Sequence, residues 1–253
     1  MPVDVVELRN FYASPLGKGV QNIIGHIVKT QWDNCSGLSI LGVGYAPPYL
    51  EAFKTEAMRV LAFMPAAQGV VNWPEEGPSC SALVETTLLP LPDSCMDRVI
   101  VIHALEAAEH PQDFMEDVWR VLTPGGKMIL VCPSRGGLWA RADNTPFGHG
   151  QPYSRRQLRD LMRDTLFSPI SWTEALYAPP FDTPLWRRVA SLIEKIGAKC
   201  ALPGAGVTIV EATKQLYRPV GGSKRLVRRG LPHLPPVLAP SPAGMTSKSE
   251  RAE

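Results

Sequence analysis

Residues 98–103, Arg-Val-Ile-Val-Ile-His, constrain the fold most, because four consecutive apolar side chains are all β-branched. Such a run is typical of a parallel strand buried on both faces, whereas a strand with one solvated face alternates apolar with polar residues. Segments 38–44 and 127–132 are similarly short and apolar, and 59–63 and 82–85 are further strand candidates. Several strands of this kind require helices on both faces of one sheet.

Segments with helical spacing of apolar residues lie between these strands. The spacing predicts helices over 19–32 and 111–122, and a third over 49–60 after Pro47 and Pro48. Pro124-Gly125-Gly126 is expected to terminate the helix over 111–122. The alternation predicts an α/β fold, a Rossmann-like and mostly parallel sheet with helices on both faces.

The second half of the chain continues this pattern less regularly. A long loop is expected over 133–153, then a helix over 154–165 capped by Ser154. Two late strands are predicted over 171–177 and 207–216, with a helix over 184–196 between them. We therefore expect one α/β domain over 1–217, in which residues 1–35 form an N-terminal helical cap.

Residues 218–253 differ in composition from this domain. They hold six prolines, four glycines and seven Lys or Arg against two Asp or Glu, a net charge of +5. We expect a disordered basic tail. Its run 224–229, Lys-Arg-Leu-Val-Arg-Arg, is a candidate for binding RNA, an acidic partner or anionic lipid, although most such runs are solvated.

Cysteine spacing and hydropathy bear on the cellular environment. The five cysteines form no CxxC pair, which disfavours a zinc site or a disulfide framework, and we expect no metal. We find no signal peptide and no apolar stretch of the roughly 18 residues that span a bilayer. The expected location is the cytoplasm, and the sequence leaves the oligomeric state open.

Residues 41–46, Leu-Gly-Val-Gly-Tyr-Ala, form a glycine turn between a predicted strand and a predicted helix. Glycines here allow a ligand to approach the backbone, and the helix that follows would present free N–H groups to it. A tight strand-to-helix turn also needs glycine without any ligand, so the turn alone leaves both interpretations open.

Three further segments lie in a fixed order. They are Leu-Pro-Leu-Pro-Asp at 89–93 leading to Asp97, His-Ala-Leu-Glu at 103–106, and 116–127, Glu-Asp-Val-Trp-Arg-Val-Leu-Thr-Pro-Gly-Gly-Lys. Over residues 38–133 the sequence resembles the class I S-adenosylmethionine (SAM) methyltransferases of the type-11 group. Segments 41–50, 64–70 and 139–150 also resemble a bacterial methyltransferase-like subgroup.

The resemblance implies the class I methyltransferase fold and SAM as the cofactor. It places the cofactor beside the glycine turn, the end of the second strand, the adenine loop and the end of the fourth strand. The implied cofactor-binding residues are Gly42, Gly44, Tyr45, Ala46, Met64, Pro65, Leu88, Leu89 and His103.

The sequence departs from the family pattern where acids are expected, so its first motif is atypical. Ile40 stands where the family has the acid that helps to hold the methionine ammonium group. Residues 61–64, Leu-Ala-Phe-Met, lack the acid that binds both ribose hydroxyls. Glu85 lies near the family's adenine-loop acid, so the cofactor is expected to be held by backbone, apolar or Glu85-region contacts.

The acceptor side of the site is less defined. His103 and Glu106 are candidate catalytic residues, although a histidine can cap a strand and a carboxylate can bond helix N–H groups. The loop after the fifth strand supplies candidate substrate residues for an anionic or aromatic acceptor, with a self-bonded surface loop as the alternative. These are Arg135, Trp139, Arg141, His149 and Tyr153.

We therefore expect a SAM-dependent methyltransferase that acts on a small molecule. The first alternative is a methyltransferase-like binding or regulatory protein with weakened or lost catalysis, because the two acids are missing. A weaker alternative is RNA methylation or RNA binding through the basic tail.

Overall fold

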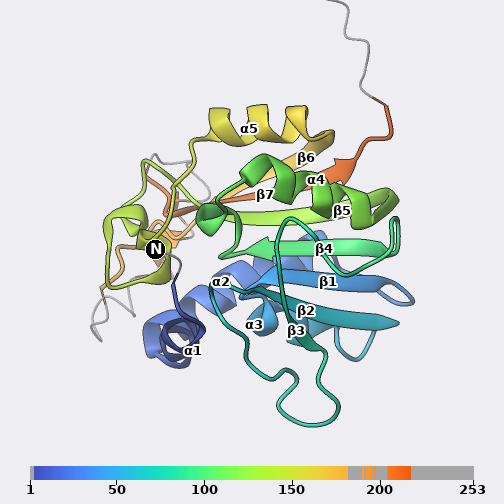
Figure 1. Ribbon diagram of the computed structural model, residues 1–253. Helices are drawn as coiled ribbons and strands as arrows, with labels where there is room; N and C mark the ends of the chain where they lie inside the picture. Colours follow the sequence, from blue (N-terminus) through green and yellow to red (C-terminus); the bar gives the residue numbers. More distant parts are fainter. Residues whose placement is uncertain (1–2, 182–189, 191, 195, 198–203, 218–253) are drawn as a thin grey trace, which may run out of the picture. The chain divides into compact units, whose positions relative to one another are not determined.

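The computed structural model describes residues 3–181, 190, 192–194, 196, 197 and 204–217 (Figure 1). The predicted helix over 184–196 falls largely outside these residues, and the basic tail over 218–253 falls wholly outside them. The α-helices are α1 (Val5–Ala13), α2 (Pro15–Gln31), α3 (Pro47–Leu50), α4 (Pro111–Val121) and α5 (Arg155–Asp164). The strands are β1 (Ser39–Gly44), β2 (Arg59–Pro65), β3 (Ser81–Val84), β4 (Met96–Ile102), β5 (Leu122–Pro133), β6 (Phe167–Ala175) and β7 (Val207–Lys214).

The strands of the described part form one sheet in the order β3-β2-β1-β4-β5-β7-β6. Strands β1 to β5 run parallel, and β7 pairs antiparallel with both β5 and β6. The order reverses at β1, which lies between β2 and β4. In open α/β sheets a ligand binds at such a switch point, beyond the carboxyl ends of the strands. The predicted fold, a mostly parallel Rossmann-like sheet, is confirmed.

Successive residues of the central strands contribute to two separate hydrophobic cores, as strand alternation requires. Ile100 and Ile102 of β4 pack with α1, α2 and α3 on one face. Val99 and Val101 pack with α4 and α5 on the other (Figure 1). The β-branched run of β4 is therefore buried on both faces, which is why it carries no polar alternation.

The predicted helix over 49–60 is wrong beyond its first turn. Helix α3 covers only Pro47–Leu50, and a 3-10 turn follows at Glu51–Phe53. Strand β2 already begins at Arg59, which pairs with Ser39, and the N–H of Met58 donates to the Leu38 carbonyl at 2.9 Å. Residues 54–58 are needed for the return to the start of the sheet, so no room remains for a longer helix.

The end of α4 also differs from the expectation. The helix ends at Val121, and Leu122 is already extended and pairs with Met96, so Pro124-Gly125-Gly126 lies inside β5. Proline disfavours helical geometry in the residue before it, and the change to extended backbone occurs just upstream of Thr123. Helix α5 begins as predicted, with Ser154 and Gln157 forming a capping box.

A clamp at the end of α4 holds the connection from β3 to β4. Arg120 donates to the Asp117 carboxylate at 2.6 Å, to Asp93 at 2.9 Å, and to the carbonyls of Leu89 and Leu91 at 2.9 and 2.8 Å. Asp117 in turn accepts the Leu89 N–H at 2.6 Å. The residues of this clamp belong to the segments 89–93 and 116–127, so those motifs have a structural role.

No helix among the described residues is long and apolar enough to cross a membrane.

Replacing Gly44 with alanine should destabilise the protein strongly. Gly44 has φ +89°, and a Cβ there would lie 2.0 Å from the Ile102 carbonyl oxygen. We expect a loss of about 2–4 kcal/mol in the free energy of unfolding, measured by urea denaturation. Gly19→Ala is the matched control, because nothing lies within 4 Å of its Cβ position, and it should stabilise α2 by up to about 1 kcal/mol. Equal effects of the two substitutions would contradict this account.

Replacing Asp117 with alanine should release the clamp. The Leu89 N–H would lose its buried acceptor, and Arg120 would lose its nearest carboxylate. The expected loss is about 3 kcal/mol, read from the same denaturation curves. Glu116→Ala, at the exposed neighbouring position, should change stability by less than about 0.5 kcal/mol. A small effect at Asp117 would show that the clamp contributes little.

Candidate functional site

The glycine turn after β1 is closed by its own backbone. The Tyr45 N–H donates to the Ile102 carbonyl at 3.1 Å, and the N–H groups of Ala46, Tyr49 and Leu50 also have carbonyl partners. Pro47 and Pro48 have no N–H at all. The expectation that the helix after the turn presents free N–H groups to a ligand is therefore wrong. Gly42 and Gly44 are required here for close packing.

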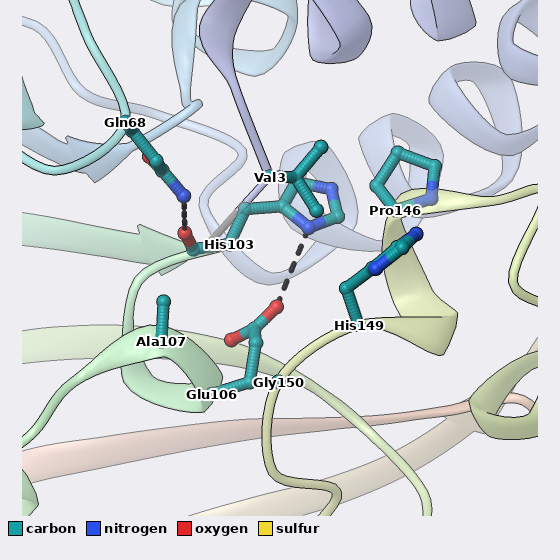
Figure 2. Close-up of a pocket in the computed structure, with 8 residues that line it drawn as sticks. All are labelled: Val3, Gln68, His103, Glu106, Ala107, Pro146, His149 and Gly150. Atoms are coloured by element: carbon teal, nitrogen blue, oxygen red, sulfur yellow. Dashed lines mark hydrogen bonds and ion pairs between the residues drawn. The ribbon is translucent and has the colours of Figure 1, made fainter. Parts of the chain in front are cut away.

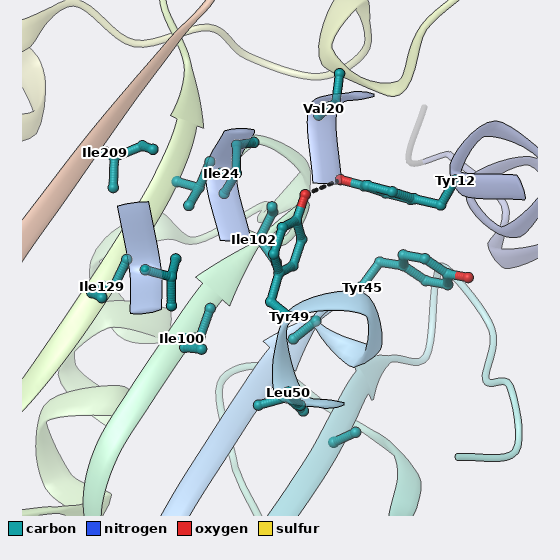
Figure 3. Packing of buried hydrophobic residues seen from close by; sticks show 14 of the residues in the cluster. Tyr12, Val20, Ile24, Tyr45, Tyr49, Leu50, Ile100, Ile102, Ile129 and Ile209 are labelled. Carbon is teal, nitrogen blue, oxygen red and sulfur yellow. Dashed lines mark hydrogen bonds between the residues drawn. The ribbon is translucent and has the colours of Figure 1, made fainter. Parts of the chain in front are cut away.

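Aromatic side chains cover this turn from the N-terminal side. The Tyr12 ring stacks on Tyr45 with centroids 5.5 Å apart, and it meets Tyr49 edge-on at 5.9 Å. Figure 3 shows Tyr12 reaching from α1 to the Tyr49 hydroxyl above the apolar core of β4 and α2. All three tyrosines are nearly fully buried. Burial raises the pKa of each of them above its usual value, so they are neutral hydroxyls at physiological pH.

Hydrogen bonds continue from these tyrosines to His103 at the end of β4. The Tyr49 hydroxyl donates to the Tyr12 oxygen at 2.9 Å, and the Tyr12 hydroxyl is hydrogen-bonded to His103 Nε2, also at 2.9 Å. The other ring nitrogen, Nδ1, lies 3.3 Å from Oε1 of Glu106. The His103 ring therefore lies between the Tyr12 hydroxyl and the Glu106 carboxylate.

His103 is held in an uncommon backbone conformation, with φ +54°. Its side chain is only 3% exposed, between Tyr12 and Phe147. Gln68, from the loop after β2, donates from its side-chain amide to the His103 carbonyl. A left-handed non-glycine residue persists only where its surroundings fix it, and such residues gather at functional sites.

Glu106 is a buried acidic residue in this region. Its side chain is 5% exposed, and neither carboxylate oxygen has a hydrogen-bond partner among the described residues. Its backbone carbonyl accepts the Gln151 N–H at 2.8 Å, which ties it to the loop after β5. Burial first, and the Glu106 charge second, raise the pKa of Cys132 well above its usual value.

The N-terminal segment covers the space in front of Glu106. The Val5 N–H donates to the Gln68 carbonyl at 2.8 Å, and Gln68 bridges the loops after β2 and β4. Because β1 lies between those strands, this bridge passes across its carboxyl end. The remaining cavity is about 10 Å³, roughly the space of one water molecule, and is lined by Val3, Gln68, His103, Glu106, Ala107, Pro146, His149 and Gly150 (Figure 2).

A larger hollow lies beside this cover. Its lining comes from the ends of three parallel strands, namely residues 65–67 at the end of β2, 85–87 after β3, and 104 and 107–110 after β4. The hollow measures about 370 Å³ and includes the exposed carboxylate of Glu85. Its size and its place at the switch point suit a nucleoside.

The predicted cofactor residues have different environments. Pro65 lines the hollow directly, Met64 is fully buried one residue earlier, and Leu88 is 73% exposed. Leu89 is buried, and its N–H is bonded to Asp117. Tyr45 and Ala46 are buried in the closed turn.

Of the predicted acceptor residues, the structure brings His103, Glu106 and His149 to one cavity. Trp139 is 2% exposed and donates to the Ala178 carbonyl at 2.8 Å, so it anchors its loop. Tyr153 is also buried, and burial raises its pKa to about 12. Arg135 and Arg141 are exposed. No cluster of three metal-ligating side chains occurs in the described parts of the chain.

Sequence analysis missed Tyr12, Tyr49, Gln68 and Phe147. Gln68 lies in segment 64–70, which the resemblance had marked without assigning it a role. Tyr12 lies 91 residues from His103, and neither helical spacing nor a motif connects the two.

Comparison with known proteins agrees with this architecture. Residues 36–130 match the family model described as a methyltransferase domain. No curated protein matches the chain significantly.

Solved structures share the fold at low sequence identity. A SAM-dependent methyltransferase from Thermotoga maritima, described as a possible histamine N-methyltransferase, is 14% identical with a TM-score of 0.59, over 83% of this chain and 96% of its own. A SAM-dependent methyltransferase from Archaeoglobus fulgidus is 16% identical with a TM-score of 0.54, over 77% and 94%. Geranyl diphosphate methyltransferase, in complex with GPP and sinefungin, is 14% identical with a TM-score of 0.54, over 76% of each chain.

Residues 36–130, which contain β1 to β4 and most of β5, match the methyltransferase-domain model, and the fold with its switch point at β1 is that of the class I SAM-dependent methyltransferases.

Proposed function

We propose that this methyltransferase acts on a small-molecule acceptor and holds the adenosine part of SAM in the hollow beside β2, β3 and β4. The observation that carries the proposal is the 370 Å³ hollow, whose walls come from the three loops that follow these strands. Pro65 and the alanines beside it offer apolar contact to a purine. Glu85 offers a carboxylate to ribose hydroxyls or to an adenine amino group.

Bound SAM supplies an electrophilic methyl group on a sulfonium centre. The chain's own contribution is to orient the two reactants and to exclude water, which can account for a large part of the acceleration in a displacement of this kind. The cover formed by Val3 and Gln68 meets the second requirement. The first falls to His103, Glu106 and His149, which line the cavity beneath this cover.

The covered position of the small cavity supports a small acceptor over a macromolecular one. The loop 133–153 approaches the end of β4 through Gly150, whose Cβ position lies 2.4 Å from the Glu106 carbonyl oxygen. Trp139 and Tyr153 fix this loop from within the core. RNA methylation through the basic tail has no support from the described residues, since the tail lies outside them.

A binding protein without turnover is the second candidate function. It is favoured by the closed glycine turn and by the 10 Å³ left in front of Glu106, which cannot hold the methionine part of SAM in this conformation. The two functions differ in product formation. A methyltransferase releases S-adenosylhomocysteine, whereas a binding protein returns SAM unchanged.

Titration calorimetry of the purified chain should show SAM and S-adenosylhomocysteine binding with micromolar dissociation constants. Folded protein that gives no heat at high micromolar ligand would contradict the proposal. Mass spectrometry after incubation with SAM and a panel of amines, phenols and carboxylic acids should detect S-adenosylhomocysteine. Binding without this product for any acceptor would favour the second candidate.

Filling the hollow should separate ligand binding from stability. Ala67 is exposed and lines the hollow, so a tryptophan there would occupy the space proposed for adenosine. Ala67→Trp should weaken SAM binding at least about tenfold in the same titration and leave thermal unfolding nearly unchanged. Ala52→Trp, another exposed alanine outside the hollow, should bind SAM normally. Unchanged affinity in Ala67→Trp would place the cofactor elsewhere.

A further inference from the structure

The surroundings of the Glu106 carboxylate do not explain why an acidic side chain is buried at this position. It is 95% buried, and the described residues provide no hydrogen bond to either oxygen. Nδ1 of His103 lies 3.3 Å from its Oε1. A buried carboxylate without partners costs several kcal/mol, so native proteins keep one mainly where a ligand or ion completes it.

The surroundings of Glu106 select a positively charged partner. Val3, Ala107 and Pro146 provide apolar walls, and the lining includes His103 and His149 but no Lys or Arg. Burial first, then Tyr49 for Tyr12 and Cys132 for Tyr153, and after them the Glu106 charge raise the pKa values of these two tyrosines. The cavity therefore offers Glu106 no permanently charged partner.

The backbone around Glu106 holds this carboxylate in a fixed place. The residue lies in the 3-10 turn Leu105–Ala107 after β4, and its carbonyl is bonded to Gln151. Gly150, with φ +77°, packs against that same carbonyl, where any side chain would clash. Figure 2 shows the carboxylate pointing toward His103, with Gln68 and His149 around the same cavity.

We propose that Glu106 is the binding group for a cationic amine at this site, and that its ligand enters when Gln68 and Val3 move aside. This inference rests on the proposed function, because that function identifies SAM as the larger ligand. Two sources can supply the amine, namely the ammonium group of the methionine part of SAM, or an amine on the acceptor. Both would form a charge-assisted hydrogen bond with the same carboxylate.

The position of Glu106 gives a reason for the apolar residue at Ile40. Ile40 is fully buried at the second position of β1, in the core beneath the N-terminal helices, so no carboxylate is supplied from there. Strand β4 is the neighbour of β1, and Glu106 follows its carboxyl end. In this chain the negative charge at the switch point comes from the adjacent strand.

The space in front of Glu106 determines how the ligand enters. A cavity of about 10 Å³ admits a water molecule but no amine with its substituent. The cover consists of the Val5–Gln68 backbone bond and the Gln68–His103 bond. The first bond joins the start of α1 to the loop after β2, and the second joins that loop to the residue after β4. Neither is a strand-to-strand bond of the sheet, so the cover can be displaced while the sheet stays paired.

Binding of two ligands to two proteins tests whether the cofactor supplies the amine that Glu106 binds. The proteins are the wild type and Glu106→Gln. The ligands are S-adenosylhomocysteine and its deamino analogue, in which hydrogen replaces the ammonium group. The wild type should bind S-adenosylhomocysteine at least about tenfold more tightly than the analogue, and the variant should show less than about a twofold preference. Glu116→Gln, an exposed carboxylate on α4, should retain the full preference.

Methylammonium chloride tests whether an amine on the acceptor is the group that Glu106 binds. If the ammonium preference is absent or independent of Glu106, millimolar methylammonium should still shift the His103 ring signals in NMR spectra of the wild type. Those shifts should disappear in Glu106→Gln. The methylammonium experiment needs no cofactor. A chain that binds no adenosine ligand would therefore contradict the proposed function, while the methylammonium response would still test the role of Glu106.

The proposal is overturned if neither the ammonium preference nor the methylammonium response depends on Glu106. Glu106→Gln could also lose affinity equally for S-adenosylhomocysteine and its analogue. That result would overturn the cofactor as the source of the amine, because it indicates a distorted binding site and not the loss of an ammonium contact. Thermal unfolding checks that the variant is folded. If it is not, the wild-type measurements still decide, since a wild type with no ammonium preference and no methylammonium response excludes a cation subsite.

Discussion

The contact between Gly44 and the Ile102 carbonyl sets the geometry of the whole carboxyl edge. Only a residue without Cβ can lie so close to this carbonyl, and the Tyr45 N–H then bonds to the same oxygen. The ends of β1 and β4 are thereby joined, and the chain turns so that Tyr45 and Tyr49 face α1. Tyr12 can reach His103 only because these two strand ends are fixed together.

Most of the sheet could be predicted from sequence because the residue patterns that specify its strands and helices are local. The apolar runs of β1, β4 and β5 and the amphipathic spacing of α4 each lie within about a dozen residues. The helix over 49–60 failed for the opposite reason. Its length is limited by the pairing of Arg59 with Ser39, a contact between segments that local periodicity does not encode.

The site was predictable only in part. His103, Glu106 and His149 meet at one cavity because strand ends and their loops converge at the switch point, which is a topological rule. Trp139 and Tyr153 are aromatic loop residues that became core anchors, and the loop sequence alone does not distinguish a ligand contact from an indole donating to the Ala178 carbonyl. Gln68 and Tyr12 depend on how the N-terminal helix packs, which no motif reports.

The clamp of Arg120 and Asp117 lies at the opposite edge of the sheet from the cavity, since α4 ends where β5 begins. The residues that carry the resemblance to methyltransferases thus maintain the connection from β3 to β4. Segments 89–93 and 116–127 are thus held by the hydrogen bonds of the fold, whereas the switch point carries Ile40 and the buried Glu106. Similarity in those two segments therefore reports shared architecture better than shared chemistry.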